Sequence, residues 1–550
     1  MYRRVNDRGD YELEAAVESR RSAPSRRDFL RSVGMTGGAG VMFAAMGALG
    51  LAPTAGAAPA FQPPRAADFR LSGRVPASVV VLGGGVAGLV AAYELGKAGY
   101  RCTVLEPRDR VGGRNFTARA GTTQTDLSGT TQTASFADGQ YMNCGPARLA
   151  QWMVTLDYCR ELRVPIEIFP NTNADAYIYN ERDGMEPGKP VRFRTVRSDV
   201  HGYVSELLAK ASARGALDME LSGEDREQLL AFLEEWGSIG GEYDYTGGSQ
   251  RGYSAYPGAA GDPGRPLHPV PDVSAVFSSA VGRYLSFESE FDQAMVMFQP
   301  VGGMDRIPQA LAGAIGADRI RTRCAATSVR QEANGVLVTY TDSSAQQREL
   351  RADYCVCAMP PHILAQLPHN LGPEVQRALT SVSPAPASKL GLEYRSRWWE
   401  TEHRIYGGIT WTDLDLRQIW HPASGFHGDR GVLIGYYNFA RNAAKYDAMT
   451  PQQRVDRAVM LGERIYGPKY RTELVSAFSQ SWMTTPYIEG AWHDLPEDTP
   501  DAAVLKPVAR PTGRVLFAGD WLSYVDAWQH GAILSARAAV TALHGRALSR

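Results

Sequence analysis

Three glycines and one carboxylate in the stretch 83–106 have the spacing of a site for phosphate and ribose groups. Gly83, Gly85 and Gly88 form the pattern G-x-G-x-x-G, and Glu106 follows further along the chain. In that pattern the first glycine permits a tight turn, the second lets the backbone approach a pyrophosphate, and the third lets a helix pack on a strand. A carboxylate about 20 residues later can accept hydrogen bonds from ribose hydroxyls. The spacing therefore predicts a dinucleotide-binding site.

The residues around the glycines predict the elements that would hold them in place. Residues 79–82 are an apolar run typical of a buried strand, residues 89–98 have helical composition, and residues 101–105 predict a second strand. The helix N-terminus would offer the pyrophosphate free N–H groups and a partial positive charge. A lone glycine pattern is also typical of an ordinary turn, but here strand, glycines, helix, strand and acid occur in order.

A second glycine-containing motif narrows the choice between the dinucleotides NAD and FAD. Residues 108–114 read R-D-R-V-G-G-R, so Gly112 and Gly113 permit a second close approach of the backbone, and Arg114 could pair with a phosphate. Together the two motifs resemble the extended FAD signature of the flavin amine oxidase family. The resemblance implies that the cofactor is FAD.

Further motifs, across about residues 76–545, resemble the L-amino acid oxidase branch of that family. They read GPARL at 145–149, VGGMDRIP at 301–308, SKL at 388–390, and LFAGD followed by AWQHGA near the C-terminus. The resemblance implies oxidative deamination of L-amino acids, with release of 2-oxo acids, ammonia and hydrogen peroxide. Its partners would be a small-molecule L-amino acid and oxygen, and homodimers are common in such families.

Three other functions stay open from the sequence. One is oxidation of monoamines or polyamines, which decarboxylated analogues of the best substrates would reveal. Another is a decarboxylating amino-acid monooxygenase, which releases an amide and carbon dioxide. The last is a non-catalytic FAD-binding scaffold, which would be yellow but not bleached by any amino acid.

The resemblance implies roles for two cationic residues in particular. The arginine at the position of Arg148 pairs with the substrate carboxylate as a bidentate fork, whereas an oxidase of simple amines has no need of that fork. The alternative for Arg148 is a contact with FAD or a neighbouring acid. Lys389 resembles the lysine that holds a water beside flavin N5; the alternative is an exposed lysine at the start of a strand.

The resemblance also places aromatic and cofactor-contacting residues. Trp528, Trp492 and Trp420 would build the substrate walls, although core packing is the ordinary role of a tryptophan. Asp520 matches the acid that binds the ribityl or pyrophosphate part of FAD. The cofactor contacts that we expect are Gly83, Gly85, Val86, Ala87, Gly88, Glu106, Arg108, Gly113, Arg114, Ala147, Arg148, Trp482, Gly519, Asp520, Ala527 and Trp528. We identify no metal site.

The fold implied by the resemblance is α/β, with a two-dinucleotide-binding, Rossmann-like FAD domain, a mixed-sheet substrate domain and a helical insertion. The boundaries that we expect are 76–135, 297–378 and 510–550 for the discontinuous FAD-binding domain, 136–197 and 379–509 for the substrate-binding domain, and 198–296 for the helical domain. The Gly/Pro-rich segment 245–272 lacks periodicity and is predicted to be a surface loop, with a mobile lid or a proteolytic site as the alternative. The polar run 117–133 is predicted to be irregular.

The N-terminal 60 residues are predicted to be a disordered n-region followed by a twin-arginine signal peptide. Residues 25–31 read S-R-R-D-F-L-R, a weakly hydrophobic Gly/Ala-rich segment follows to about residue 51, and small-residue cleavage candidates lie at 55–60. The alternative is a transmembrane anchor, which the many glycines disfavour. We therefore expect an exported protein, periplasmic or secreted.

Bulk properties set limits on size and partners. The chain has 550 residues, enough for two or three domains, and its formal net charge of -1 gives no reason to expect nucleic acid or a stable membrane association. Its six cysteines do not form a small-domain disulfide framework. Cys355 and Cys357 are expected to direct their sulfurs to opposite faces of a strand, which suits burial more than metal binding.

Overall fold

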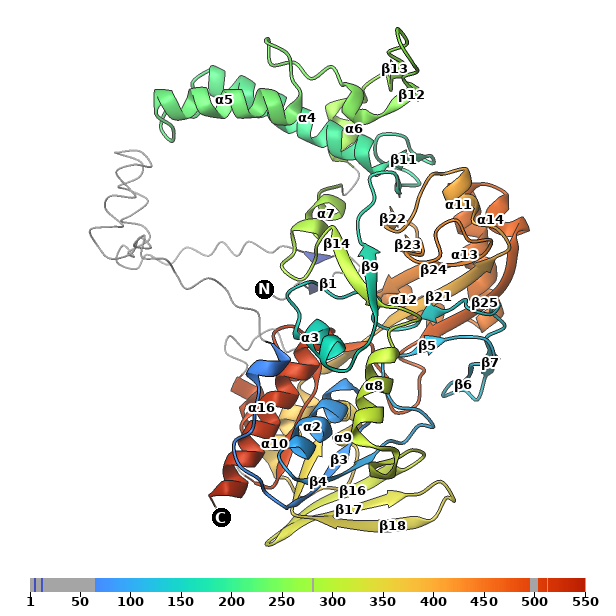
Figure 1. Ribbon diagram of the computed structural model, residues 1–550. Coiled ribbons are helices and arrows are strands. Elements are labelled where there is room, and N and C mark those ends of the chain that lie inside the picture. The colour runs from blue at the N-terminus through green and yellow to red at the C-terminus, as the bar shows by residue number, and fades with distance from the viewer. Residues whose placement is uncertain are drawn as a thin grey trace. The chain divides into compact units, whose positions relative to one another are not determined.

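A computed structural model describes residues 65–278, 281–494, 503–511 and 513–549, together with two short paired strands, β1 (Arg4–Val5) and β2 (Tyr11–Glu12). The predicted twin-arginine segment and its cleavage candidates lie outside the described residues. None of the described helices is both long and apolar enough to cross a bilayer. The chain divides into two compact units, one containing Pro63–Asn173 and Glu288–Arg550 and the other Ala174–Phe287 (Figure 1).

A five-stranded parallel sheet forms the centre of the first unit, in the order β15-β4-β3-β19-β27. Its strands are β3 (Ser78–Leu82), β4 (Arg101–Leu105), β15 (Ile320–Arg321), β19 (Tyr354–Cys357) and β27 (Val515–Phe517). The predicted strands at 79–82 and 101–105 are confirmed. The order reverses between β3 and β19, and ligands of such sheets bind outside the carboxyl ends of the strands at that point.

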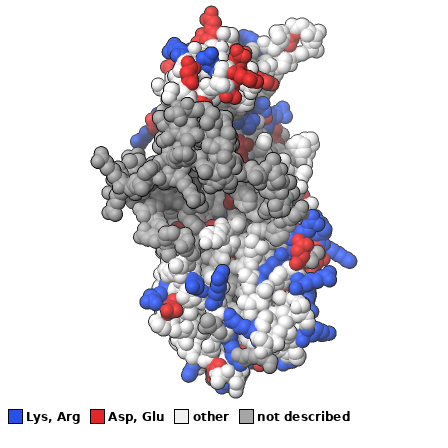
Figure 2. All heavy atoms as spheres, turned by 90° about the vertical axis from the view of Figure 1, so that its left-hand side faces the viewer, with Lys and Arg blue, Asp and Glu red and all other residues white. Residues whose placement is uncertain are grey.

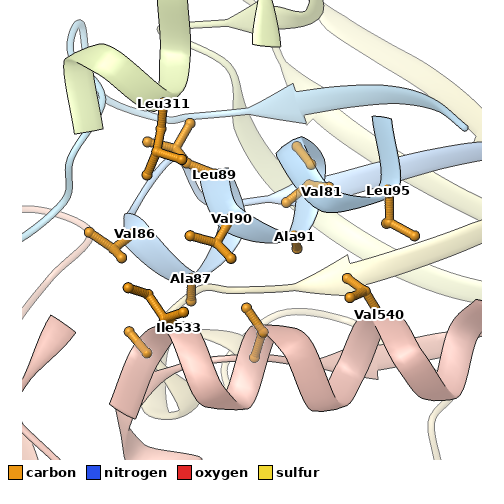
Figure 3. Close-up of a cluster of buried hydrophobic side chains, with 14 of the residues drawn as sticks. Val81, Val86, Ala87, Leu89, Val90, Ala91, Leu95, Leu311, Ile533 and Val540 are labelled. Atoms are coloured by element: carbon orange, nitrogen blue, oxygen red, sulfur yellow. The ribbon is translucent and has the colours of Figure 1, made fainter. Parts of the chain in front are cut away.

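Helix α2 (Val86–Lys97) connects the first two strands and is buried between α8 (Arg306–Ile315) and α16 (Gln529–Leu548). Figure 3 shows Leu311 of α8 on one side of α2, and Ile533 and Val540 of α16 on the other. Side chains of this kind each stabilise a fold by roughly 1.5–3 kcal/mol when fully buried. This core therefore fixes one end of the chain against the other.

A three-stranded antiparallel sheet packs beside the parallel sheet (Figure 1). It contains β16 (Ala325–Glu332), β17 (Gly335–Thr341) and β18 (Gln347–Ala352). Glu332 pairs with Gly335, so β16 and β17 form a tight hairpin.

The other large sheet of the first unit contains antiparallel strands in the order β22-β23-β24-β21-β25. They are β21 (Ala387–Tyr394), β22 (Ile409–Thr412), β23 (Gln418–Trp420), β24 (Gly431–Phe439) and β25 (Leu474–Ser481). Strand β21 lies between β24 and β25, and all of its residues are buried. In the register Lys389 lies opposite Tyr437, so this sheet can direct several side chains into one region.

Shorter elements complete the first unit. The strands are β5 (Thr117–Ala118), β6 (Thr123–Thr125), β7 (Thr131–Thr133), β8 (Met142–Asn143), β9 (Ile166–Pro170), β14 (Val296–Pro300), β20 (Ser383–Ala385) and β26 (Trp492–Asp494). The α-helices are α3 (Val154–Glu161), α9 (Pro361–Leu364), α10 (Pro373–Thr380), α11 (Trp398–Thr401), α12 (Ala440–Asp447), α13 (Pro451–Tyr466), α14 (Lys469–Thr472) and α15 (Lys506–Ala509). Short 3-10 helices are η1 (Ala66–Asp68), η4 (Ala317–Arg319), η5 (Ala503–Leu505) and η6 (Asp520–Leu522).

The second unit is mainly helical. Its elements are β10 (Tyr177–Tyr179), β11 (Pro190–Arg192), α4 (Phe193–Ala213), α5 (Gly223–Gly237), η2 (Ser249–Arg251), β12 (Tyr253–Ala255), β13 (Arg265–Pro266), α6 (Val273–Phe277) and α7 (Val281–Ser286), and η3 (Phe287–Ser289) follows. A new helix, α5, begins after Ser222, because the Ser222 side chain caps its N-terminus by accepting a hydrogen bond of 3.1 Å from the Asp225 N–H.

Segment 245–272 is mostly irregular and contains one short hairpin, in which β12 pairs with β13, and the buried guanidinium of Arg251 forms an ion pair of 2.5 Å with Asp199. Two expectations from the sequence are wrong. Run 117–133 is not irregular, since β6 and β7 form a hairpin. The sulfurs of Cys355 and Cys357 lie 3.8 Å apart, because residues i and i+2 of a strand share a face.

Charged side chains of both signs are scattered over the described part of the face in Figure 2. Lys and Arg occur there together with Asp and Glu, in keeping with the formal net charge of -1.

Candidate active site

The two glycine motifs lie against each other at the carboxyl end of β3. The Gly112 N–H donates a hydrogen bond of 2.8 Å to the Gly84 carbonyl, and Gly112 pairs with Gly85 as an isolated bridge. A Cβ on Gly88 would lie 2.0 Å from the Gly83 carbonyl oxygen, whereas a Cβ on Gly85 would have no atom within 4 Å. The surroundings of Gly88 are therefore closed by protein, and those of Gly85 leave room for a ligand.

Glu106, the residue after β4, lies against the two glycine motifs, which together we call the glycine cradle. Its buried carboxylate accepts hydrogen bonds from the Gly84 N–H at 2.7 Å and the Arg108 N–H at 3.0 Å. Burial raises the pKa of Glu106, and the two N–H groups oppose that shift. Each carboxylate oxygen has capacity for a second bond, so Glu106 can also accept from ribose hydroxyls.

Two half-buried arginines of the second glycine motif have side-chain nitrogens that would fit a dinucleotide. Nη1 of Arg108 and Nη2 of Arg110 are buried and have no hydrogen-bond partner among the described residues. Burial lowers the pKa of Arg108; burial, followed by the charge of Arg108, lowers the pKa of Arg110 to about 9. Because buried N–H groups of cations are costly without an anion, these residues fit a pyrophosphate. Arg110 was not among the predicted contacts, although it lies in the same R-D-R-V-G-G-R motif.

Arg114 binds a carboxylate of the chain itself. Its Nη1 donates to Asp520 Oδ2 at 3.0 Å and to the Ala491 carbonyl at 2.8 Å, and its Nη2 pairs with Asp520 Oδ1. Although burial alone would raise it, the Arg114 guanidinium holds the pKa of Asp520 below its ordinary value. Asp520 also accepts from the Ala527 N–H at 3.1 Å. A contact of Arg114 with phosphate stays a prediction. In the structure Arg114 holds the carboxylate of Asp520 in place.

Lys389, on β21, lies among aromatic rings from neighbouring strands; we call this group, with Arg148 and Trp528, the aromatic box. Its Nζ lies 4.3 Å from the ring centroid of Tyr437 and 5.0 Å from that of Trp420, and it donates a hydrogen bond to the Gly145 carbonyl. The side chain is only 2% exposed, so it is not the exposed lysine of the alternative interpretation. Burial, followed by the charge of Arg148, lowers the pKa of Lys389 to about 7.

Arg148 shares the Trp420 indole with Lys389. Its guanidinium carbon lies 4.5 Å from the Trp420 ring centroid and 5.9 Å from that of Trp528. Burial lowers the pKa of Arg148 to about 10, so it remains a cation near neutral pH. The structure therefore brings together Arg148, Lys389 and two of the three predicted wall tryptophans.

A short polar chain positions the guanidinium of Arg148. Its Nε donates to Gln293 Oε1 at 3.3 Å, and the same oxygen accepts from Asn171 Nδ2 at 3.3 Å. Gln293 in turn donates from Nε2 to Asp292 at 3.3 Å, and Asp292 accepts from the Trp528 indole N–H at 2.6 Å. Sequence reasoning missed Asn171, Asp292 and Gln293, because none belongs to a motif.

The third wall tryptophan belongs to the same row of rings. Ring centroids are 5.3 Å apart for Trp420 and Tyr437, 4.3 Å for Tyr437 and Phe439, and 5.8 Å for Phe439 and Trp492. Trp492 thus contacts the row through Phe439. Sequence reasoning did not single out Tyr437 or Phe439, which alternate along β24.

The other predicted contacts have these positions. Trp482 is buried in a hydrophobic cluster and donates from its indole to the Cys144 carbonyl at 3.2 Å, so it supports the loop whose Gly145 carbonyl binds Lys389. The Gly519 N–H donates to Ser535 Oγ at 2.9 Å. Val86 and Ala87 begin α2, and Gly113 belongs to the second glycine motif. Ala147 is the buried residue before Arg148, and Trp528 is the N-cap of α16.

The chain is similar in sequence and in fold to known proteins. The family model of flavin containing amine oxidoreductases matches residues 86–544, so the chain belongs to that family and the family implies a flavin cofactor. The chain is 28% identical to the L-amino-acid oxidase of Pseudechis australis, over 84% of this chain and 85% of that protein. It is 26% identical to the L-amino-acid oxidase of Vipera ammodytes ammodytes, over 84% of this chain and 91% of that protein.

A solved structure with a similar fold is the cyclohexylamine oxidase from Brevibacterium oxydans IH-35A. It has 17% sequence identity and a TM-score of 0.58, and the alignment covers 86% of this chain and all of that chain. The likeness shows the fold: an α/β protein with a parallel cofactor-binding sheet, as predicted.

Proposed function

We propose that the chain is an FAD-dependent L-amino acid oxidase, which converts an L-amino acid, water and oxygen into a 2-oxo acid, ammonia and hydrogen peroxide. The observation that supports it most is the position of the Arg148 guanidinium on the indole shared with Lys389. A guanidinium is well suited to bind an anion such as a carboxylate, because its N–H groups form a bidentate fork. The carboxylate of an amino acid is such an anion, and a simple amine carries none.

Each residue of the site would have a distinct task. Arg148 binds the carboxylate as a fork and fixes the orientation of the α-carbon. Bound FAD would accept the α-hydrogen as a hydride and pass the two electrons to oxygen. Lys389, with a pKa of about 7, exchanges a proton with the water that hydrolyses the imino acid. The rings of Trp420, Trp492 and Trp528 keep bulk water from the α-carbon.

The amino-acid panel with peroxide detection tests the reaction. Purified protein should be yellow and should release peroxide, ammonia and a 2-oxo acid with at least one L-amino acid. Equal turnover of its decarboxylated analogue would instead indicate an amine oxidase, and an amide with carbon dioxide, seen by mass spectrometry, would indicate a monooxygenase. A yellow protein that no amino acid bleaches under nitrogen would indicate a scaffold.

The variant Arg148→Met tests the carboxylate contact. Loss of a buried charged partner costs about 2–5 kcal/mol, so we expect kcat/KM for amino acids to fall by about 10²- to 10³-fold while the flavin absorbance is retained. Arg148→Lys is the matched control, because it keeps the charge and loses the fork, and it should be intermediate. Full activity of the methionine variant would contradict the assignment.

Two further expectations stay predictions. Export through the twin-arginine route depends on residues 25–31, and replacing both arginines with lysine in the full chain should keep the protein inside the cell. The division of the first unit into a cofactor part and a substrate part, at residues 378 and 510, is likewise proposed from the motif order.

A further inference from the structure

Two histidines from distant segments, His493 buried and His362 half-buried, form a pair beside the carboxyl edge of the parallel sheet. His362 belongs to α9, which follows β19, and His493 belongs to β26. Nδ1 of His362 and Nε2 of His493 are 3.0 Å apart, which is a hydrogen bond between the two rings. Neither residue is part of any motif or of the site described above.

The pair has two further ring nitrogens that nothing in the described chain satisfies. Nε2 of His362 and Nδ1 of His493 are both buried and have no hydrogen-bond partner among the described residues. Burial, followed by the charge of Arg114, lowers the pKa of both histidines, that of His493 to about 3. Both imidazoles are therefore neutral near pH 7.

Because both rings are neutral, the pair presents one hydrogen-bond donor and one acceptor to its surroundings, whichever tautomers are present. Two neutral imidazoles joined by one hydrogen bond share one proton between the facing nitrogens, and the other proton is on one of the outer nitrogens. One outer nitrogen is thus an N–H donor and the other is a bare acceptor. A group that both accepts and donates would satisfy the two.

The position of the pair indicates which group that is. His362 lies just past the carboxyl end of β19, and β19 pairs with β3 where the strand order reverses. The turn after β19 also touches the first glycine, since a Cβ on Gly83 would lie 2.8 Å from the Ala358 carbonyl oxygen. His493 in turn lies within the electrostatic reach of Arg114 and Asp520. The pair therefore borders the crevice where a dinucleotide would lie.

We propose that His362 and His493 together bind the ribityl–pyrophosphate chain of FAD. One outer nitrogen donates to a phosphate or hydroxyl oxygen of that chain, and the other accepts from a ribityl hydroxyl. The assignment rests on the proposed function only for the identity of the cofactor as FAD. Both histidines are positioning residues and take no part in the oxidation itself.

Asparagine and glutamine substitutions separate the outer nitrogens from the facing ones. An Asn amide reproduces the Nδ1 position of a histidine, and a Gln amide reproduces the Nε2 position. His493→Asn and His362→Gln therefore keep the outer polar atom, while His493→Gln and His362→Asn keep only the atom that faces the other ring. FAD affinity of the full chain is measured by flavin fluorescence after FAD is stripped and added back.

The expected result is a crossed pattern. His493→Gln and His362→Asn should weaken FAD binding by about tenfold, because each leaves one cofactor group unpaired, and His493→Asn and His362→Gln should remain within about twofold of the wild type. The melting temperature without FAD should fall equally in the two members of each pair.

A control histidine measures the cost of disturbing a buried ring elsewhere. His544 is also buried, but both of its nitrogens have partners, Tyr100 Oη at 2.9 Å and the Ser72 carbonyl at 2.6 Å. His544→Asn and His544→Gln should lower the melting temperature and leave FAD affinity unchanged.

Unchanged FAD affinity in all four variants of the pair would overturn the proposal, and a water molecule would then be the partner of the outer nitrogens. The same holds if the affinity follows the facing nitrogens instead. None of these readouts requires turnover, so a failure to oxidise amino acids would refute the proposed function and leave this test intact.

Discussion

The glycine cradle and the aromatic box bring their contacting groups together in two different ways. In the cradle, the contacts are backbone hydrogen bonds and close approaches within one stretch, from Gly83 to Arg114. In the box, the contacts are side chains from separate elements, such as Arg148, Lys389 on β21 and Trp528 before α16. Every residue has the same backbone groups, so the shape of the cradle depends mainly on the positions of its glycines, which have no side chain. A box depends on which side chains are present.

Both regions contain cationic side chains, but these cations have different surroundings. Arg108 and Arg110 have buried N–H groups without partners in the described chain, as a site for a pyrophosphate would. Arg148 and Lys389 instead lie on the faces of aromatic rings, which attract cations. The first arrangement is suited to a ligand held permanently, and the second to one that enters and leaves.

The largest effect is expected from a methyl group at the closed end of the cradle. In Gly88→Ala the new Cβ would lie 2.0 Å from the Gly83 carbonyl oxygen, so α2 must move away from the turn. We expect the protein to be colourless and mostly insoluble. The measurement is the ratio of flavin to protein absorbance in the soluble fraction.

The companion variant Gly85→Ala sharpens this test. A Cβ there meets nothing within 4 Å in the protein, so the fold should be retained while the cradle no longer admits the pyrophosphate. A soluble protein with a normal far-UV spectrum and little flavin is the expected result. If Gly85→Ala keeps its flavin, the space beside Gly85 is not the cofactor site.

A smaller, two-sided effect is expected for Lys389→Met in the box. Loss of a group that exchanges protons during the reaction should lower kcat/KM by about 10²-fold. Stability should change in the opposite direction, because the variant removes a buried charge. Enhanced stability together with lost activity is the signature of a residue kept for function.

The pH dependence follows from the sign of the shift. The pKa of Lys389 in the folded protein, about 7, lies below its ordinary value of 10.5. The buried charge therefore lowers the free energy of unfolding by its full amount below pH 7, and this effect disappears above about pH 10.5. The methionine variant should therefore have the higher free energy of unfolding at pH 6, and the difference should narrow toward pH 10. Denaturant titrations of both proteins at the two pH values measure it. A variant that is less stable at pH 6 would contradict the buried-charge account.

The contrast between the two regions also explains how much the sequence could predict. The cradle could be predicted from residue types alone, because G-x-G-x-x-G and the acid after β4 have fixed spacing and a physical reason for each position. Arg148, Lys389 and Trp528 required the family resemblance, since nothing in their own neighbours indicates that they converge.

Residues that hold others in place could not be predicted at all. Asp292 and Gln293 lie in a segment without periodicity, and His362 and His493 are 131 positions apart. Their importance comes from distances in the folded chain. The short hairpin within segment 245–272 could not be predicted for a related reason, because it has the composition of a loop and is held by the ion pair between Arg251 and Asp199.

The smallest effect, and the sharpest test of the box, is expected for Gln293→Leu. Gln293 Oε1 accepts from Arg148 Nε, so the substitution should let the guanidinium turn without removing its charge. Loss of orientation affects binding of the carboxylate first. We expect KM for amino acids to rise by about tenfold, the value of one lost hydrogen bond to a charged group, while kcat changes only a few-fold.

Gln299→Leu is the matched control, because it removes another buried glutamine of the same segment whose amide donates to Glu167 at 2.8 Å. It should change the melting temperature and leave KM unaltered. A fall in kcat at constant KM for Gln293→Leu would mean that Gln293 acts on the reacting atoms and not through Arg148. Steady-state kinetics with one amino acid, in both variants, distinguish the two outcomes.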